Sequence, residues 1–516
     1  MSTENKTALL VQVPGSNRHE QGYIPLGLLA VNNLLKAEGY SVGVTDFFFE
    51  SPEGFQSTLE TLQPGLIGFG GIASSFGLAR TLSATCRQVC PQALLIAGGP
   101  LASAYDLLLE DGVVDYVFHG EVERSLPRFI RFLETGRDLQ AIGGMSYRRE
   151  RLSPSSAEAL DGDRLVRNDH ILRSVPEKLV PRLDEYGFPE YGLLKIERYM
   201  GDLNSWYEHS RFDIDKIPEL GSRVRGLIAQ GKRRFFSVVT SRGCTHRCAF
   251  CYRHVKGIRR QGVDHVIEHL RRIKRDFDVD GINFTDELFN SDLKWIYELC
   301  DGLDTLGFSF YMVGGMRVDR IDDNLLERMA RTGFVEIAMG HESGSDKVLA
   351  YYRKGVTRQQ NIDATLMARR NGINPTVQLV IGSPVETTAT ILETAGFLRA
   401  VDVSIASINY ILPLPETPIW AEVVPKGRIG DVRVYLDRVR TYGPFFRIAL
   451  NLTESSLLTW YLWREILRRT TSMNLYQKSP LKWLYYASWI FVILDPVRAV
   501  FRRLKRLLSK GPAHVS

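Results

Sequence analysis

The sequence predicts an α/β protein with a doubly wound, Rossmann-like parallel sheet, then a partial (β/α)6 barrel of the TIM type, then a helical C-terminal segment. Three observations support this fold class. Short apolar runs alternate with stretches of helical periodicity along most of the chain. Many of these runs are apolar at every position, which indicates strands buried on both faces of a parallel sheet. The 516 residues are enough for two or three domains, each with its own core.

Residues 1–140 make up the first predicted domain. Strands are expected at residues 7–14, 41–47, 66–71, 92–100 and 113–120, with a helix at 26–39. Glycines gather where strands end, at Gly70, Gly71, Gly98, Gly99 and Gly120. Ligands of open parallel sheets bind at the carboxyl ends of the strands, so these glycines indicate a small-molecule site unless they are ordinary turn residues. No G-x-G-x-x-G follows the first strand, so the dinucleotide fingerprint is absent.

Residues 141–230 are polar and turn-rich and are predicted to connect the first domain to a second, at residues 231–425. The strands of the second domain are expected at 235–243, 281–287, 309–318, 334–342, 375–384 and 404–415. Amphipathic helices are expected between them, at 262–277, 291–305, 322–332, 357–371 and 387–400. Six strand and helix units predict a partial barrel whose catalytic groups lie on the loops that follow the strands.

The charge is concentrated near one end of the chain. The protein carries a formal net charge of +6, and residues 481–510 contain seven basic residues against Asp495 alone. A general nucleic-acid surface is therefore not expected. Six cysteines in so long a chain, without a signal segment at Met1, predict a cytoplasmic location and cysteines that serve metal or redox chemistry.

Three of the cysteines lie close together in "CTHRCAFC", directly after a predicted strand. Cys244, Cys248 and Cys251 are separated by three and then two residues. Structural zinc prefers four protein ligands, and no local Cys or His pair completes the set, although His246 and His254 lie close. A [4Fe–4S] cluster held by only three thiolates keeps one iron open for an outside ligand. The pattern favours the iron–sulfur cluster over zinc.

This motif resembles that of the radical S-adenosylmethionine (SAM) superfamily, in which the open iron binds the amino and carboxylate groups of SAM. Segments 282–289, 339–357, 377–387 and 412–418 are similar to later motifs of that family, in the same order. The resemblance implies that Cys244, Cys248 and Cys251 are the cluster ligands and catalytic residues. It implies SAM contacts at Phe250, Glu287 or its neighbour Asp286, Glu342, Ser343, Lys354 and Gln378. Phe250 would pack beside the adenine or belong to the core, and Val385 and Glu416 stand where the family usually has glycine.

The first domain resembles the cobalamin-binding domain that precedes radical SAM barrels in one class of these proteins. Segments 24–46, 71–76, 94–103 and 113–130 carry the similarity, and residues 182–194 resemble the connector of that class. The resemblance implies cobalamin contacts at Pro25, Leu26, Gly27, Ser74, Ser75, Gly98, Gly99, Pro100, Gly120 and Glu121. The two serines would hydrogen-bond cofactor amides or cap a helix. No D-x-H-x-x-G occurs, so no histidine is offered as a lower cobalt ligand.

The remaining cysteines and two aromatic residues have simpler interpretations. Cys86 and Cys90 lie four residues apart on a predicted helix and Cys300 closes another, which indicates buried structural thiols rather than a second cluster. Tyr410 and Trp420, after the last strands, are candidates for substrate contact.

Residues 426–516 are predicted to form a helical C-terminal region. Residues 483–494 are a twelve-residue apolar run, too short to span a bilayer. The segment 497–508 then places apolar residues on one helix face and basic residues on the other. This pattern fits peripheral attachment to the inner face of an anionic membrane, unless the helix packs on the barrel with a solvated basic face.

Together the resemblances imply an enzyme that uses a [4Fe–4S] cluster, SAM and cobalamin. The main hypothesis is a methyltransferase that methylates an unactivated carbon of a lipid-like or secondary-metabolite substrate through a 5′-deoxyadenosyl radical, with an electron donor of the flavodoxin or ferredoxin type. An anaerobic oxidative cyclase with the same cofactors, like those that form porphyrin rings, is the alternative. A corrinoid or redox sensor without turnover is the hypothesis from another class, because fold and cofactor do not determine the reaction.

Overall fold

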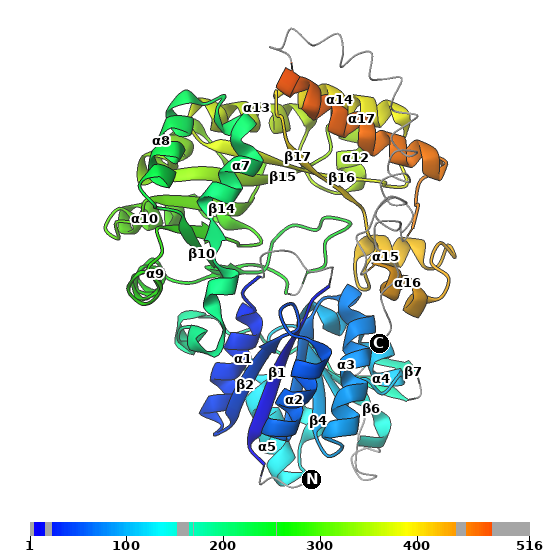
Figure 1. The fold of residues 1–516 in the computed structure, drawn as a ribbon. Coiled ribbons are helices and arrows are strands. Elements are labelled where there is room, and N and C mark those ends of the chain that lie inside the picture. Colours follow the sequence, from blue (N-terminus) through cyan, green and yellow to red (C-terminus); the bar gives the residue numbers. More distant parts are fainter. Residues whose placement is uncertain are drawn as a thin grey trace, which may run out of the picture.

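Two mainly parallel sheets organise the protein (Figure 1). The computed structural model describes residues 5–15, 23–151, 165–168, 170–253, 255–439 and 450–476. The first sheet has eight strands in the order β2-β1-β3-β4-β5-β6-β8-β7, and the second has seven in the order β17-β16-β15-β14-β13-β10-β9. The strand and helix alternation predicted for both domains is therefore confirmed. The apolar run at 483–494 and the amphipathic segment at 497–508 lie outside the described residues.

The first sheet is built from short, buried, β-branched and leucine-rich strands with helices between them. Its strands are β1 (Thr7–Val13), β2 (Ser41–Asp46), β3 (Leu66–Gly71), β4 (Leu94–Gly98), β5 (Tyr116–Phe118), β6 (Met145–Arg148), β7 (Leu165–Asn168) and β8 (Ile171–Arg173). Its helices are α1 (Leu26–Ala37), α2 (Pro52–Leu62), α3 (Phe76–Val89), α4 (Tyr105–Glu110) and α5 (Ser125–Thr135). The strands β1 to β5 are parallel, whereas β6, β8 and β7 extend the sheet in antiparallel pairs. The sheet thus continues beyond residue 140 into the turn-rich segment.

The second sheet curls into a partial barrel of six parallel strands with one antiparallel strand at its edge. Its strands are β9 (Gly201–Asp202), β10 (Arg234–Val238), β13 (Gly281–Phe284), β14 (Phe310–Met316), β15 (Phe334–Glu342), β16 (Asn374–Ile381) and β17 (Ala406–Tyr410). The helices of this part are α7 (Leu203–Ile214), α8 (Pro218–Ala229), α9 (Val263–Phe277), α10 (Leu293–Leu303), α11 (Asp323–Thr332), α12 (Asp346–Tyr351), α13 (Arg358–Arg370), α14 (Thr388–Ala400), α15 (Pro418–Val423), α16 (Val432–Val439) and α17 (Leu457–Tyr476).

Local sequence explains where these helices begin and which face they bury. Thr357 and Thr387 accept hydrogen bonds from the backbone N–H three residues later, which caps α13 and α14. In α9, four apolar residues at helical spacing are buried, namely Val266, Ile267, Leu270 and Ile273. The buried face of α9 also includes His269, whose Nε2 lies 3.0 Å from the hydroxyl oxygen of Tyr191.

The two sheets do not have separate cores. One buried cluster contains Val11 and Phe69 of the first sheet together with Tyr352, Ile419 and Leu436 of the second domain. The helix α16 contacts α3 of the first domain, and Figure 1 shows α15 next to α16, above α3. The two domains are therefore packed as one body.

The helix α17 covers the last part of the second sheet. Trp460 and Trp463 are fully buried among residues of α14 and β17, and the indole Nε1 of Trp463 donates to Thr388 Oγ1 at 3.0 Å. Tyr410, a predicted substrate contact, packs on Trp460 with ring centroids 4.4 Å apart. Trp420 packs on Tyr435. In the described part of the chain, no helix has the length and apolarity needed to cross a bilayer.

A buried carboxyl group closes the loop that follows β16. Glu386 is 3% exposed, and its Oε2 accepts hydrogen bonds from the backbone N–H groups of Gly382 and Ser383. Burial raises the pKa of Glu386 to about 7 from an ordinary value of 4.5, against the lowering effect of the two backbone donors. The folded chain therefore binds a proton here more tightly than the unfolded chain does.

The wild type should lose stability as pH rises through 7, because Glu386 then loses its proton. We expect Glu386→Gln, which cannot ionise, not to show this loss. The stability from the raised pKa is fully present below 4.5 and is lost above the folded-state pKa, by up to about 3 kcal/mol. The measurement is the thermal midpoint of both proteins from about pH 5.5 to about pH 8.5. The thermal midpoint of the variant should rise relative to that of the wild type as pH increases. If the two midpoints change in parallel with pH, the raised pKa of Glu386 is contradicted.

Candidate active site

The three predicted cluster ligands lie on one loop that a short β-ribbon closes. The strands β11 (Ser241–Arg242) and β12 (Arg259–Arg260) pair antiparallel, and we call them the ribbon and residues 243–258 the cysteine loop. The backbone of Ala249 holds the loop from two sides, since its N–H donates to Tyr352 O and its carbonyl accepts from Ile419 N, both at 2.9 Å. The loop is thus fixed to the barrel at its middle as well as at its ends.

The environment of the three cysteines fits an iron–sulfur cluster. Cys244 and Cys248 are partly buried and Cys251 is exposed. Although Cys251 is exposed at the loop surface, loss of surrounding water raises the pKa of its thiol to about 12, and the nearby charges of Cys248 and Glu287 add to this. A metal must displace this proton. Among the described residues, no three His, Cys, Asp or Glu side chains converge on one ion. A cubane needs no such convergence, because each thiolate binds a different iron.

Asp286 and Glu287, which the sequence left as alternatives, have different roles in the structure. Asp286 is buried and accepts hydrogen bonds from the backbone N–H and the hydroxyl of Thr240, at 3.0 and 3.1 Å, and from the hydroxyl of Ser241. Its carboxylate therefore holds the start of the ribbon. Glu287 is exposed, close to Cys251, and burial of its surroundings followed by the charge of Asp286 raises its pKa. Of the two, Glu287 has the carboxylate that a ligand can reach.

A second carboxylate lies near the cysteine loop in a strained conformation. Glu342, at the end of β15, has a φ of 62° and its Oε1 accepts a hydrogen bond from Lys354 Nζ at 3.0 Å. A Cβ at Gly340 would lie 2.5 Å from Glu342 Oε1 and 2.9 Å from Lys354 Nζ, so a larger residue at position 340 would displace this pair. Strain of this kind is tolerated mainly at functional sites.

Of the other predicted SAM contacts, one is exposed and two pack or hydrogen-bond within the protein. Gln378 is exposed on β16, and Phe250 packs edge-on against Tyr352 with centroids 5.2 Å apart. The hydroxyl of Ser343 accepts from Ser345 N at 3.1 Å and lies 3.2 Å from Thr394 Oγ1, within a buried turn. Phe250 and Ser343 therefore have structural contacts, whereas Gln378 is free to meet a ligand.

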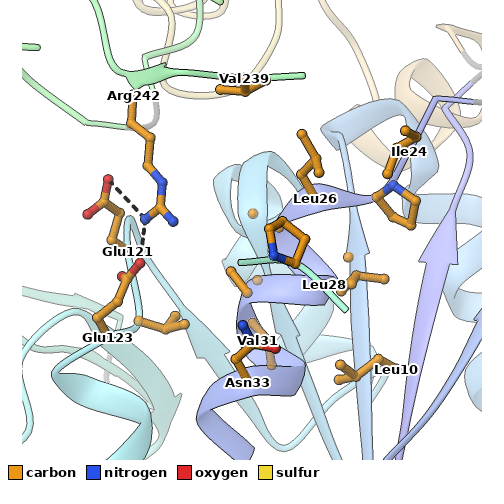
Figure 2. A pocket seen from close by; sticks show the side chains of 18 of the residues that line it. Leu10, Ile24, Leu26, Leu28, Val31, Asn33, Glu121, Glu123, Val239 and Arg242 are labelled. Atoms are coloured by element: carbon orange, nitrogen blue, oxygen red, sulfur yellow. Dashed lines mark hydrogen bonds and ion pairs between the residues drawn. The ribbon is translucent and has the colours of Figure 1, made fainter. Parts of the chain in front are cut away.

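A cavity of about 570 Å³ lies between the two domains (Figure 2). The first domain contributes the ends of β1, β3, β4 and β5 and one face of α1, and the second contributes the ribbon and the residues after β10 and β13. The lining includes most of the predicted cobalamin contacts, namely Pro25, Leu26, Gly27, Gly98, Gly99, Pro100, Gly120 and Glu121. It also includes Glu287, which connects the cavity to the cysteine loop.

Two glycines of this cavity, Gly27 and Gly98, border space that the protein itself does not fill, whereas Gly70 and Gly71 are tightly packed. A Cβ at Gly27 would meet no atom within 4 Å, and one at Gly98 would meet only Phe118, at 3.9 Å. Gly99 has a φ of 66°, so the loop after β4 also needs glycine for its conformation. Packing within the protein therefore does not require glycine at Gly27 or Gly98, and the open space beside them suits a bulky ligand.

Ser74 and Ser75 are not among the residues that line the cavity. Their hydroxyl groups donate to Gly15 O at 3.1 Å and to Val13 O at 2.8 Å, and the Ser75 hydroxyl also accepts from Ile72 N. The two serines thus hold the loop after β3 against the end of β1. Both hydroxyl groups therefore hydrogen-bond to backbone groups of the protein.

Two glutamates and two arginines join the cavity wall to the ribbon. Arg242 forms an ion pair with Glu123 and lies 3.7 Å from Glu121, and Arg259 pairs with Glu121. Figure 2 shows Arg242 reaching from the ribbon toward both carboxylates, across the cavity from Leu26 and Leu28. The sequence analysis singled out only Glu121 of these residues. Two glutamates directly after the glycine of a strand end, and an arginine two residues before Cys244, were the available signals.

Glu416 also connects the domains, at the position where the family pattern has glycine. Its φ of 66° is the left-handed conformation that glycine adopts readily, so the backbone shape is kept despite the substitution. The carboxylate forms an ion pair with Arg173 of β8, whose guanidinium lies 4.9 Å from the centre of the Tyr105 ring. This contact from the first domain offsets the cost of a side chain in that conformation.

Comparison with known families agrees with this division. Residues 18–130 match the family described as "B12 binding domain", and residues 238–398 match the family described as "Radical SAM superfamily". The chain is a radical SAM protein with a B12-binding domain. Its cofactors are a [4Fe–4S] cluster, SAM and cobalamin, as predicted. The cavity and the cysteine loop described above are the places in this chain with the space and the donor groups for them.

The relatives of this chain include proteins named as methyltransferases and as cyclases. An uncharacterized methyltransferase of Pyrococcus horikoshii is 24% identical over 403 residues, which cover 77% of each chain. An anaerobic magnesium-protoporphyrin IX monomethyl ester cyclase of Synechocystis is 23% identical over 370 residues, which cover 70% of this chain and 64% of the cyclase. The radical SAM methyltransferase TsrM of Kitasatospora setae, solved with cobalamin and a [4Fe–4S] cluster, shares the fold with a TM-score of 0.60. It is 17% identical, and the match covers 82% of this chain and 76% of TsrM.

Replacing Cys244, Cys248 or Cys251 with alanine should abolish cluster binding, because two thiolates cannot hold the cubane in place. Iron and acid-labile sulfide should fall to background in protein purified and reconstituted without oxygen. The matched control is Cys300→Ala, since Cys300 is a buried free thiol. It should keep the iron and lose about 1 kcal/mol of stability. Retention of a full cluster by any of the three variants would contradict the assignment.

Proposed function

We propose that the protein is a methyltransferase that methylates an unactivated carbon of a lipid-like or secondary-metabolite substrate. The observation that carries this proposal is a cavity that the carboxyl-terminal ends of strands from both sheets border. Gly98 and Gly120 on one wall and Thr285 and Glu287 on the other face the same space. A methyl-carrying cofactor on one wall and a radical-forming site beside the other would need this arrangement.

When bound, the cluster and SAM supply a radical that removes hydrogen from carbon, and cobalamin supplies the methyl group. The residues of the chain bind and orient these groups. Glu287 is the carboxylate suited to receive the ammonium group of SAM, because Asp286 is committed to the ribbon. Leu26 and Leu28 provide an apolar wall that limits water in the cavity.

The relatives support two reactions of the same cofactor class. The methyltransferase relative favours methyl transfer, and the cyclase relative favours oxidative ring formation as the second candidate. The sensor without turnover is separated from both reactions by Cys244→Ala, which should leave a sensor's cellular effect intact and should abolish the effect of an enzyme. The lipid-like character of the substrate is part of the proposal and rests on the sequence of the C-terminal segment.

The deciding experiment feeds methyl-deuterated methionine to anaerobic cells with and without the protein. Mass spectrometry of lipid and pigment extracts should show a product that is heavier by one labelled methyl group. Cells expressing Cys244→Ala are the control, because they make the chain without its cluster. A product that has only lost hydrogens would replace methyl transfer with cyclisation. An unchanged pair of extracts would refute the lipid-like substrate.

Glu287→Gln should weaken SAM binding by about tenfold, because a charge-assisted hydrogen bond to the ammonium group becomes a neutral one. The iron content should not change. The comparison variant is Asp286→Asn, which disturbs the ribbon and should lower cluster retention instead. Equilibrium dialysis of reconstituted protein with labelled SAM measures the first effect and iron analysis the second. Equal SAM affinity in Glu287→Gln and wild type would remove Glu287 from the SAM site.

A further inference from the structure

Lys354, which holds Glu342 in place, lies in a turn with an unfavourable backbone conformation. The turn follows α12, and its residues Arg353 and Gly355 have φ angles of 52° and 71°. A residue other than glycine is disfavoured in this left-handed region, so the turn needs support from neighbouring segments. This support matters for the site, because Lys354 Nζ donates to Glu342 Oε1 at 3.0 Å. A shift of the turn would move the carboxylate.

Arg317, directly after β14, supplies that support. Its Nη2 donates to the carbonyl oxygen of Lys354 at 2.8 Å, and its Nε and Nη2 donate to Asp319 at 2.8 and 3.0 Å. Arg317 is 5% exposed, so water competes little for these hydrogen bonds. One guanidinium group thus ties the loop after β14 to the turn that carries Lys354.

The loop after β13 holds the backbone of Arg317 in turn. Asn290 is fully buried; its Nδ2 donates to Arg317 O at 2.8 Å and its Oδ1 accepts from Arg317 N at 2.9 Å. Asn290 lies three residues after Glu287. One hydrogen-bonded path therefore runs from the loop that carries Glu287, through Arg317 and Lys354, to Glu342.

The Glu342 carboxylate is the part of this path that a ligand can reach. Its Oε1 is occupied by Lys354, whereas its Oε2 accepts no hydrogen bond from the described residues and keeps some contact with solvent. The Arg317 guanidinium, in contrast, faces Asp319 and the Lys354 carbonyl. Arg317 is therefore placed to act on a ligand through Lys354 rather than by direct contact.

We propose that Arg317 is a positioning residue for SAM, which fixes the Glu342 carboxylate through Lys354. The inference rests on SAM as the ligand of this site, as the proposed function also does, and does not depend on methyl transfer. Lysine in place of Arg317 would keep the charge but lose the planar fork that reaches Asp319 and the Lys354 carbonyl together. The turn would then relax, and Lys354 would hold Glu342 less precisely.

Arg317→Lys should bind SAM about tenfold more weakly than the wild type, in full-length protein reconstituted with its cluster without oxygen. Iron content and the circular dichroism spectrum should not change. Equilibrium dialysis with labelled SAM gives both the number of sites and their affinity. A variant that merely folds less well would lose sites and keep the affinity of those that remain. Wild-type affinity in the variant would overturn the proposal.

Asp319→Asn is a milder second variant, because Asp319 is exposed and its loss leaves the bond from Arg317 to the Lys354 carbonyl in place. A neutral partner holds the guanidinium less firmly, so SAM should bind about threefold more weakly. If Arg317→Lys does not load its cluster, wild-type affinity in Asp319→Asn would overturn the proposal.

A double variant tests whether the effect passes through Glu342. Glu342→Gln weakens the partner on which Lys354 acts, so adding Arg317→Lys to it should weaken SAM binding by about twofold at most. A further loss of about tenfold would mean that Arg317 affects SAM by another route, and the proposal would be wrong.

Arg369→Lys is the matched control. Arg369 also donates to backbone carbonyls, at Val401 and Asp402, but it precedes β16 and so lies at the amino-terminal end of the barrel strands, opposite the cysteine loop. It should keep the wild-type affinity for SAM. A weakened Arg317→Lys in a protein that transfers no methyl group would support this inference while refuting the proposed function.

Discussion

The ion pairs between the ribbon and the loop after β5 are the interaction on which the site depends. Arg242 and Arg259 are direct neighbours across the ribbon, and each reaches a glutamate of the first domain. Arg242 is only two residues before Cys244. The position of the cysteine loop is therefore set by the first domain as well as by the barrel. Since both glutamates are almost fully buried, loss of one partner would cost about 3–5 kcal/mol, far more than the intact pairs contribute.

The hydrophobic core also fixes the first domain and the barrel relative to each other. Tyr352 accepts a hydrogen bond from the cysteine loop through its carbonyl and packs in the core of the first sheet through its side chain. On the opposite side, Leu29 of α1 is buried in the core of the second domain. Relative motion of the two domains would break both cores at once. The cavity between them is therefore a fixed feature of one packed body, and its width is set by side-chain packing.

The sequence predicted the fold and the chemistry better than the contacts. Strand and helix alternation follows local periodicity, and three cysteines at this spacing indicate a cluster by themselves. Both features could therefore be predicted from the sequence. The pairing of Arg242 with Glu123 joins residues 119 positions apart, and no local pattern indicates it. The sequence assigned Ser74 and Ser75 to cofactor amides or to a helix cap, and in the structure their hydroxyl groups donate to backbone carbonyls. A short polar side chain near a strand end serves either purpose, and only the neighbouring backbone decides between them.

The two walls of the cavity differ in composition, which indicates that they have different roles in ligand binding. The wall from the first domain is mostly backbone and apolar side chains, as at Gly98 and Leu28, and it recognises a ligand by shape. The opposite wall is polar and charged at Arg242, Thr285 and Glu287. A large cofactor is held most economically by a preformed surface with few polar contacts, because little ordering is needed when it binds. The groups that must respond to charge during a reaction belong on the barrel side, where Asp286 and the ribbon hold them in place.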